Sequence, residues 1–433
     1  MVSNIICLEL SLITLLLYIY LCFSKSQQLK TFHTIIIGGG PAGLFTAISV
    51  GRSDTLLLEK NSQLGKKLLI AGSGRCNITH AGAINDFFNR YGEHGKFLKS
   101  ALKEFTNVDI VNFFSKHGLN TVVDKNDKIF PVTDRAEDVL SCLMTACLHL
   151  SVNINVESSV VSVSKSDDLF NVVTDSDTFH CNNLVIATGG ASYPTTGSTG
   201  DGYSFAKCFG HTIVDPKPAL TPVFVKKYEL ANLAGVSLHD VSIGLYRKDR
   251  KIAERRGDLG FTHKGISGPG IIDFSRSFEV GDVLKVNIIG CNEDHFRQQF
   301  IDASARQGNM TIQTLLRNYN LPKSLMRIVL EEIGIEASDF LSNINAQKRT
   351  QLVVLLCSYP FEIERVGSFK VAMTTAGGVN LHEVDLKTMM SKLVPNLYFA
   401  GEVLDIDGDT GGYNIQAAFS TGHLVGKTIR LKS

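Results

Sequence analysis

The chain has 433 residues, of which 44% are hydrophobic and 20% are charged, and its formal net charge is +1. This length is too great for one ordinary hydrophobic core, so we expect two or three domains. The composition excludes a disordered chain, and the near-zero charge argues against a nucleic-acid partner because no basic surface is expected.

The nine cysteines are scattered, with no C-x-x-C pair and no cluster of cysteine and histidine at zinc spacing. Disulfide frameworks and zinc sites both need such patterns. The sequence therefore predicts a reduced intracellular protein that has no metal site.

Residues 5–23 form an apolar stretch that only Glu9 interrupts. A stretch of about 20 apolar residues is long enough to cross a bilayer. No Lys or Arg precedes it, whereas Lys25 and Lys30 follow it, so the positive-inside tendency favours a single-pass membrane anchor with the rest of the chain facing the cytoplasm. A cleaved signal peptide and an inert extension of a cytoplasmic protein are the open alternatives.

A compact β-α-β unit follows this stretch. Residues 33–37 are a short apolar run that predicts a buried parallel strand, and residues 41–52 predict a helix with a proline in its first turn. Residues 55–58 predict a second buried strand, which ends at Glu59.

Farther along the chain, the pattern of apolar residues predicts helices near 97–117 and 135–150, short strands from 160 to 180, and a buried strand at 184–188. The pattern of apolar and turn-forming residues changes after Pro194. The predicted elements are then a β-rich region over 221–290, a more helical region over 297–356, a buried strand over 394–400 and a final helix over 414–431. The simplest architecture is a discontinuous α/β nucleotide-binding domain with a large insertion between about 195 and 365.

The segment Gly38-Gly39-Gly40-Pro41-Ala42-Gly43 matches the G-x-G-x-x-G pattern directly after a predicted strand and at the start of a predicted helix. These glycines permit a tight turn, close approach of the backbone to a pyrophosphate, and close packing of helix on strand. Glu59 stands about 20 residues later, where an acidic residue binds ribose hydroxyls. A glycine turn without a ligand would not explain the placement of Glu59, so the sequence predicts a Rossmann-type dinucleotide site.

Two later segments favour FAD over NAD as the dinucleotide. The strand at 184–188 ends in Thr188-Gly189, and the strand at 394–400 ends in Gly401-Glu402, whose carboxylate can accept hydrogen bonds from ribityl hydroxyls. Gly412 then opens the final helix, and a helix N-terminus stabilises negative charge at the N1–C2=O end of a reduced flavin.

Six motifs occur in order, GKKLLI at 65–70, GRCNIT at 74–79, IFPVTDRA at 129–136, FTH with GISGP at 261–269, TAGGV at 375–379, and AGEVLD through GGYN at 400–414. With them the chain, from about Thr34 to its C-terminus, resembles the BaiN/RdsA-type NAD(P)/FAD-dependent oxidoreductases, which are related to aminoacetone oxidase. Small departures exist, such as Thr374 where the family often has Val. The apolar N-terminus is not a usual family feature, so no location is taken from the resemblance.

The resemblance implies an FAD domain, an inserted β-rich substrate domain and a small helical domain. The expected division is 1–30 for the N-terminal segment and linker, 31–194 plus 366–433 for the FAD domain, 195–300 for the β-rich domain and 301–365 for the helical domain. The expected cofactor contacts, combining the motifs and the resemblance, are Gly38, Gly40, Pro41, Ala42, Gly43, Glu59, Lys60, Arg75, Cys76, Asn77, Thr188, Gly189, Gly401, Glu402, Gly412, Tyr413, Asn414 and Ile415.

Several of these residues have two interpretations. Arg75 can bind the pyrophosphate and Asn77 can contact the flavin ring, whereas Cys76 is either a redox partner of the flavin or, by preference, a buried packing residue. The candidate catalytic residues are His263, as a proton donor or a turn residue, and Tyr413, which either lines the substrate face or packs under the last helix.

Asp405, Asp407 and Asp409 lack the spacing of a calcium loop, so a flexible acidic turn is expected there.

Only one dinucleotide fingerprint is present, so NAD(P)H, if used, has no Rossmann domain of its own and docks transiently against the flavin. The predicted function is an FAD-dependent oxidoreductase in which NAD(P)H reduces the flavin and hydride then passes to an unsaturated small molecule. The alternatives are an oxygen-using oxidase of a small amine, a tRNA-modifying flavoprotein and a non-catalytic flavin-binding protein. The sequence does not determine the oligomeric state.

Overall fold

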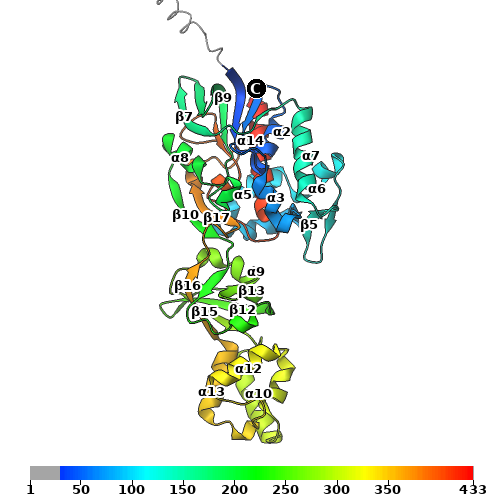
Figure 1. The fold of residues 1–433 in the computed structure, drawn as a ribbon, viewed down its shortest axis with the longest axis vertical. Coiled ribbons are helices and arrows are strands. Elements are labelled where there is room, and N and C mark those ends of the chain that lie inside the picture. Colours follow the sequence, from blue (N-terminus) through cyan, green and yellow to red (C-terminus); the bar gives the residue numbers. More distant parts are fainter. Residues whose placement is uncertain (1–29, 433) are drawn as a thin grey trace, which may run out of the picture.

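A computed structural model describes residues 30–432, which form three parts stacked along the longest axis of the molecule (Figure 1). The largest part contains both the first and the last described segments, and we call it the Rossmann body. A closed β-barrel lies in the middle, and a group of helices lies at the far end (Figure 1).

The Rossmann body is built on a seven-stranded sheet of order β6-β2-β1-β9-β8-β7, with β18 paired to β9. Strands β6, β2, β1, β9 and β18 are parallel, while β8 and β7 add an antiparallel edge. The strands are β1 (Lys30–Ile37), β2 (Thr55–Leu58), β6 (Asn153–Asn155), β7 (Val160–Ser166), β8 (Leu169–Thr174), β9 (Thr178–Ile186) and β18 (Leu397–Phe399).

Two smaller sheets complete this body. They are β3-β5-β4, formed by Thr79–His80, Lys128–Pro131 and Thr121–Val123, and β10-β17, formed by Ile213–Ala219 and Thr374–Val379. The helices of the body are α2 (Pro41–Val50), α3 (Lys66–Ile70), α4 (Ile84–Phe87), α5 (Gly95–Glu104), α6 (Asn107–Lys116), α7 (Ala136–His149), α8 (Asp201–Cys208) and α14 (Tyr413–Lys432).

The first β-α-β unit and the last helix match their sequence predictions closely, and the α/β fold class is confirmed. The single helix predicted over 97–117 is instead two helices, α5 and α6, because Thr106 starts a new one. Its hydroxyl accepts from the Asp109 N–H at 3.2 Å while the Asp109 carboxylate accepts from the Thr106 N–H at 2.8 Å. This capping box satisfies free N–H groups that a continuous helix would not have.

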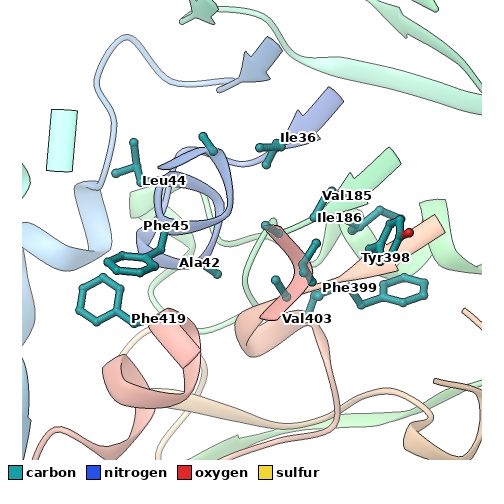
Figure 2. Close-up of a cluster of buried hydrophobic side chains, with 14 of the residues drawn as sticks. Ile36, Ala42, Leu44, Phe45, Val185, Ile186, Tyr398, Phe399, Val403 and Phe419 are labelled. Atoms are coloured by element: carbon teal, nitrogen blue, oxygen red, sulfur yellow. The ribbon is translucent and has the colours of Figure 1, made fainter. Parts of the chain in front are cut away.

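The core of the Rossmann body lies between the sheet and helices α2 and α14. Phe45 of α2 meets Phe419 of α14 with ring centroids 5.1 Å apart (Figure 2). The two helices approach closely because α14 has glycines where it crosses α2: a Cβ on Gly426 would lie 2.4 Å from the Cβ of Ser49. Small residues at this crossing therefore let the middle of α14 pack directly on α2, where a Cβ on Gly422 would lie 2.5 Å from the carbonyl oxygen of Ala42.

The barrel has the strand order β11-β14-β13-β12-β15-β16. Its elements are β11 (Val223–Val225), β12 (Ser237–Arg247), β13 (Arg250–Phe261), β14 (Gly265–Ser267), α9 (Pro269–Ile272), β15 (Val283–Asn287) and β16 (Tyr359–Val366). The helices α10 (Glu293–Arg306), α11 (Ile312–Leu316), α12 (Lys323–Glu332) and α13 (Ala346–Cys357) are inserted between β15 and β16. Full closure leaves the barrel without free strand edges.

The predicted membrane location requires correction. Across residues 30–432, no helix is both long and apolar enough to cross a membrane. The apolar stretch at 5–23, on which the prediction of a membrane-anchored protein rested, lies outside the described residues.

Candidate functional site

A cavity of about 580 Å³ opens at the carboxyl ends of the parallel strands β1, β9 and β18. Open α/β sheets bind ligands at this edge, where the loops after adjacent strands meet. Among the predicted contacts, the cavity is lined by Gly38, Gly40, Pro41, Ala42, Glu59, Asn77, Thr188, Gly189, Gly401, Glu402, Gly412, Asn414 and Ile415.

The glycine loop after β1 has the shape that a dinucleotide requires. A Cβ on Gly43 would lie 1.9 Å from the carbonyl oxygen of Gly38, so only glycine allows α2 to pack so closely on β1. Gly40 has no atom within 4 Å of an ideal Cβ and lines the cavity, which leaves its backbone open to a ligand at the N-terminus of α2. These positions fit a pyrophosphate.

Glu59 is held at the end of β2 by neighbouring N–H groups. Its carboxylate accepts from the Gly39 N–H at 2.9 Å, and from the backbone and side chain of Asn61 at 2.9 and 2.6 Å. Lys60 instead bonds to Asp201 at 2.5 Å, and lines a smaller cavity of about 40 Å³ beside Gly38. Glu59 is thus oriented toward both cavities before any ligand binds.

The Arg75-Cys76-Asn77 segment contributes one side chain to the cavity. The buried Oδ1 of Asn77 has no hydrogen-bond partner among the described residues, so a donor from a cofactor would satisfy it. Arg75 lies nearer the surface, 2.7 Å from Asp134 and over the Phe130 ring, and is not among the lining residues. Cys76 is fully buried and is not among the residues that line the cavity. Burial raises the pKa of its thiol to about 12.

Glu402 accepts several hydrogen bonds within the protein. Lys67 bonds to its two carboxylate oxygens at 3.0 and 2.8 Å, and the Thr375 N–H and the Ser192 hydroxyl donate to Oε1 at 2.9 and 3.1 Å. Lys67 belongs to the GKKLLI motif, but the motif alone gave it no role. Because Oε2 is bonded only to Lys67, Glu402 retains capacity to accept from a ligand in the cavity.

The loop before α14 also lines the cavity, through Asp409 to Gly412. Asn414 clamps this loop: its side chain accepts from the Gly408 N–H at 2.8 Å and donates to the Gly408 carbonyl at 2.9 Å. Asp405, Asp407 and Asp409 are all buried. Asp407 and Asp409 pair with Arg276, and Asp405 accepts from the Gly377 N–H at 2.9 Å, so the loop is held by specific contacts instead of being the flexible acidic turn predicted from the sequence.

The structure does not bring His263 or Tyr413 into the lining of the cavity. His263 is exposed in the turn between β13 and β14. Tyr413 is buried, stacked on His80 at 5.0 Å and edge-on to Phe87, and its backbone oxygen accepts from the Tyr91 hydroxyl at 2.8 Å. This position matches the alternative interpretation of Tyr413 as a packing residue.

The sequence did not indicate the large apolar side chains in the cavity lining, which we call the apolar wall. It is formed by Ile70, Phe130, Leu220, Ile272 and Met373. These residues come from five separate segments. Ile70 and Phe130 lie in the GKKLLI and IFPVTDRA motifs, but the motifs gave them no role, so only folding brings the five side chains together. Within residues 30–432, no group of three or more His, Cys, Asp or Glu side chains could hold a metal ion.

A family model described as the HI0933-like protein Rossmann domain matches residues 32–428. Ribosomal RNA dihydrouridine synthase of Escherichia coli (strain K12) is 31% identical over 399 residues, covering 91% of this chain and 96% of that protein. The 3-dehydro-bile acid delta(4,6)-reductase of Clostridium scindens is 32% identical over 403 residues, covering 90% and 97%. A flavocytochrome c3 fumarate reductase aligns over 95% of this chain and 79% of its own, at 14% identity and a TM-score of 0.49.

Proposed function

Because the chain belongs to the HI0933-like family of Rossmann-domain proteins, we propose that it reduces a carbon–carbon double bond conjugated to a carbonyl group. The chain is an FAD-dependent oxidoreductase, and the family resemblance drawn from its six motifs is confirmed. We propose reduction of a double bond, in preference to other flavin reactions, because of what the names of two relatives say. Dihydrouridine is uridine with hydrogen added across a ring double bond, and a delta(4,6)-reductase is named for double bonds.

The residues around the cavity fit FAD. The open Gly40 backbone and the N-terminus of α2 would hold the pyrophosphate, Glu59 the ribose, and Glu402 the ribityl chain. The unpaired Oδ1 of Asn77 would accept a hydrogen bond from the flavin part. When bound, FAD supplies hydride chemistry that no amino-acid side chain can perform.

The apolar wall and three lysines suit a flat, conjugated substrate. Ile70 and Met373 are each nearly half exposed and line the cavity, so an apolar ring could lie against them. Lys66, Lys67 and Lys128 line the same cavity. An ammonium group near the substrate carbonyl would stabilise the negative charge that develops on its oxygen as hydride arrives at the double bond.

The electron donor is NAD(P)H in this proposal, docking transiently because the sequence has a single dinucleotide fingerprint. Anaerobic mixing of the FAD-loaded protein with NADH or NADPH tests this electron donor, because reduction of the flavin removes its absorbance at about 450 nm. Bleaching by one nucleotide, followed by recovery on adding an enone, would support both half-reactions. Flavin that stays oxidised with both nucleotides but is bleached by an amine would overturn the proposal.

A uracil base in ribosomal RNA is a second candidate substrate. The observation that favours it is 31% identity to a ribosomal RNA dihydrouridine synthase over 96% of that protein. Ribosomal RNA incubated with the FAD-loaded protein and NADPH would gain dihydrouridine, measured by mass spectrometry of nucleosides, while protein stripped of FAD serves as control. RNA without dihydrouridine, together with turnover of a free enone, would leave the small-molecule substrate.

A further inference from the structure

A buried cluster of acidic and basic side chains joins the Rossmann body to the barrel. From the Rossmann body come two aspartates of the loop before α14, and from the barrel come two arginines and an aspartate. The members are Asp407, Asp409, Arg255 of β13, Asp273 directly after α9, and Arg276 of the short helix η5 (Ser275–Ser277).

Asp409 is the centre of this cluster. Its Oδ2 accepts from Nη2 of Arg255 at 2.7 Å, and its Oδ1 accepts from Nη2 of Arg276 at 2.8 Å. Arg276 also donates through Nη1 to the carbonyl oxygen of Asp407 at 2.9 Å. The Thr410 N–H donates to Oδ1 of Asp273 at 2.7 Å. Each of these hydrogen bonds joins the barrel to the loop.

The bonded loop is also a wall of the cofactor cavity. Asp409, Thr410, Gly411 and Gly412 all line it. Gly411 and Gly412 have φ values of 113° and 97°, and consecutive glycines have many accessible conformations. The two glycines have no side chains with which to fix the shape of this stretch, so its position depends on the contacts made by the neighbouring residues, above all Asp409.

The cluster is better suited to fixing geometry than to adding stability. Asp409 is 6% exposed, and removing charges from water offsets much of the attraction between them. Bidentate and forked contacts of arginine with carboxylate and carbonyl oxygens are, however, strongly directional. Two arginines that converge on one carboxylate therefore restrict where Asp409 and its neighbours can lie.

We propose that Arg255 and Arg276 are positioning residues that act through Asp409 to hold the 405–412 loop in the shape the flavin site requires. The barrel then takes part in forming the cofactor site, although its strands contribute no dinucleotide motif. This role rests on the proposed placement of FAD in the cavity, and it holds for either candidate substrate.

The structure offers a matched control for general destabilisation. Arg247 donates through Nε and Nη2 to Asp282, both at 2.9 Å, and Asp282 is buried like Asp409. This pair lies within the barrel and none of its atoms lines the cavity. Replacing Arg247 therefore removes a comparable ion pair without touching the 405–412 loop.

The test compares Arg276→Gln, the conservative Arg276→Lys and the control Arg247→Gln. Backbone hydrogen exchange of 404–414 is measured in protein stripped of FAD, and the Kd for FAD is measured by quenching of flavin fluorescence. Removing one partner of a buried charge pair costs about 2 kcal/mol or more, so we expect exchange to be faster by a factor of about 30 or more in Arg276→Gln. The Kd should rise in the same variant, Arg276→Lys should recover part of both effects, and Arg247→Gln should change neither.

Unchanged exchange of the loop in Arg276→Gln would overturn the proposal, as would equal acceleration in Arg247→Gln. Since exchange is read without FAD, a loop that loosens with no change in Kd would refute the placement of FAD while leaving the anchoring of the loop intact. A double-mutant cycle that combines Arg276→Gln with Asp409→Asn tests whether Arg276 acts through Asp409. Because Arg276 also donates to the Asp407 carbonyl, Arg276→Gln should keep a smaller effect in the Asp409→Asn background than in the wild type, whereas full additivity would show that Arg276 does not act through Asp409.

Discussion

Replacing Gly40 by alanine should separate folding from cofactor binding. An ideal Cβ at this position meets no atom within 4 Å, and the backbone there is extended, with φ −83° and ψ −176°, which alanine adopts without strain. The new methyl group would instead occupy the cavity beside the N-terminus of α2. The protein should therefore fold normally and bind FAD poorly.

The expected changes in stability and in FAD affinity follow from three free-energy contributions, of which two are small and one is larger. Gly40 is the N-cap of α2, where alanine is worse than glycine by about 0.5–1 kcal/mol. Alanine also restricts the unfolded chain, which stabilises the protein by about 0.4–1 kcal/mol, so the free energy of unfolding should change little. Loss of one charge-assisted hydrogen bond to the pyrophosphate costs about 1.5–3 kcal/mol. The Kd for FAD should then rise about 10- to 150-fold.

Gly43→Ala is the matched contrast. Its Cβ would lie 1.9 Å from the Gly38 carbonyl oxygen, which is backbone and cannot move aside cheaply, so this variant should lose about 1–3 kcal/mol of stability or more. Denaturant unfolding of the FAD-free proteins and titration of FAD by fluorescence measure the two quantities. If Gly40→Ala bound FAD with the affinity and spectrum of the wild type, the glycine loop would not approach the pyrophosphate and the assignment of this cavity would be refuted.

Three further predictions concern packing, reactivity and pH. Gly426→Ala should lower the free energy of unfolding by about 1–3 kcal/mol, because its Cβ would meet Ser49 at 2.4 Å, whereas Gly308→Ala, with no atom closer than 3.4 Å, should be nearly neutral in the same denaturation assay. Cys76 should resist iodoacetamide in the native protein at pH 8, measured by mass spectrometry, because burial raises its pKa to about 12; rapid alkylation would contradict its buried position. Burial lowers the pKa of His423 below its ordinary 6.5, so unfolded chains bind the proton more readily and stability falls as pH drops through about 6.5. His423→Gln should therefore lose less stability than the wild type between pH 7.5 and 5.5, and an equal or greater loss would refute this sign.

The part of the cavity lining that the glycine loop and Glu59 form was largely predictable because its signals are local. The Gly38–Gly43 turn, the strand–helix junction around it and Glu59 lie within one β-α-β unit, and each position is dictated by contacts between near neighbours. The later segments at Thr188 and Glu402 were recognised as apolar strands that end in a glycine turn or a carboxylate, and the structure pairs both strands in parallel beside β1.

Side-chain direction was less predictable than position along the chain. Arg75 and Asn77 are two residues apart, yet Arg75 pairs with Asp134 near the surface while Asn77 faces the cavity. Tyr413 follows a cavity-lining glycine but turns toward His80 and Phe87. The backbone conformation at each residue decides this direction, and a motif does not encode it.

By itself, the sequence determined that this chain is a Rossmann-type flavoprotein with an insertion, because glycine spacing, apolar strands and one acidic residue are properties of short segments. Only the tertiary structure decided which side chains line the cavity. The apolar wall assembles from distant segments, and Asp409 meets Arg255 from 154 positions earlier in the chain. Contacts of this kind arise when the barrel packs against the Rossmann body, and no local pattern of residues specifies them.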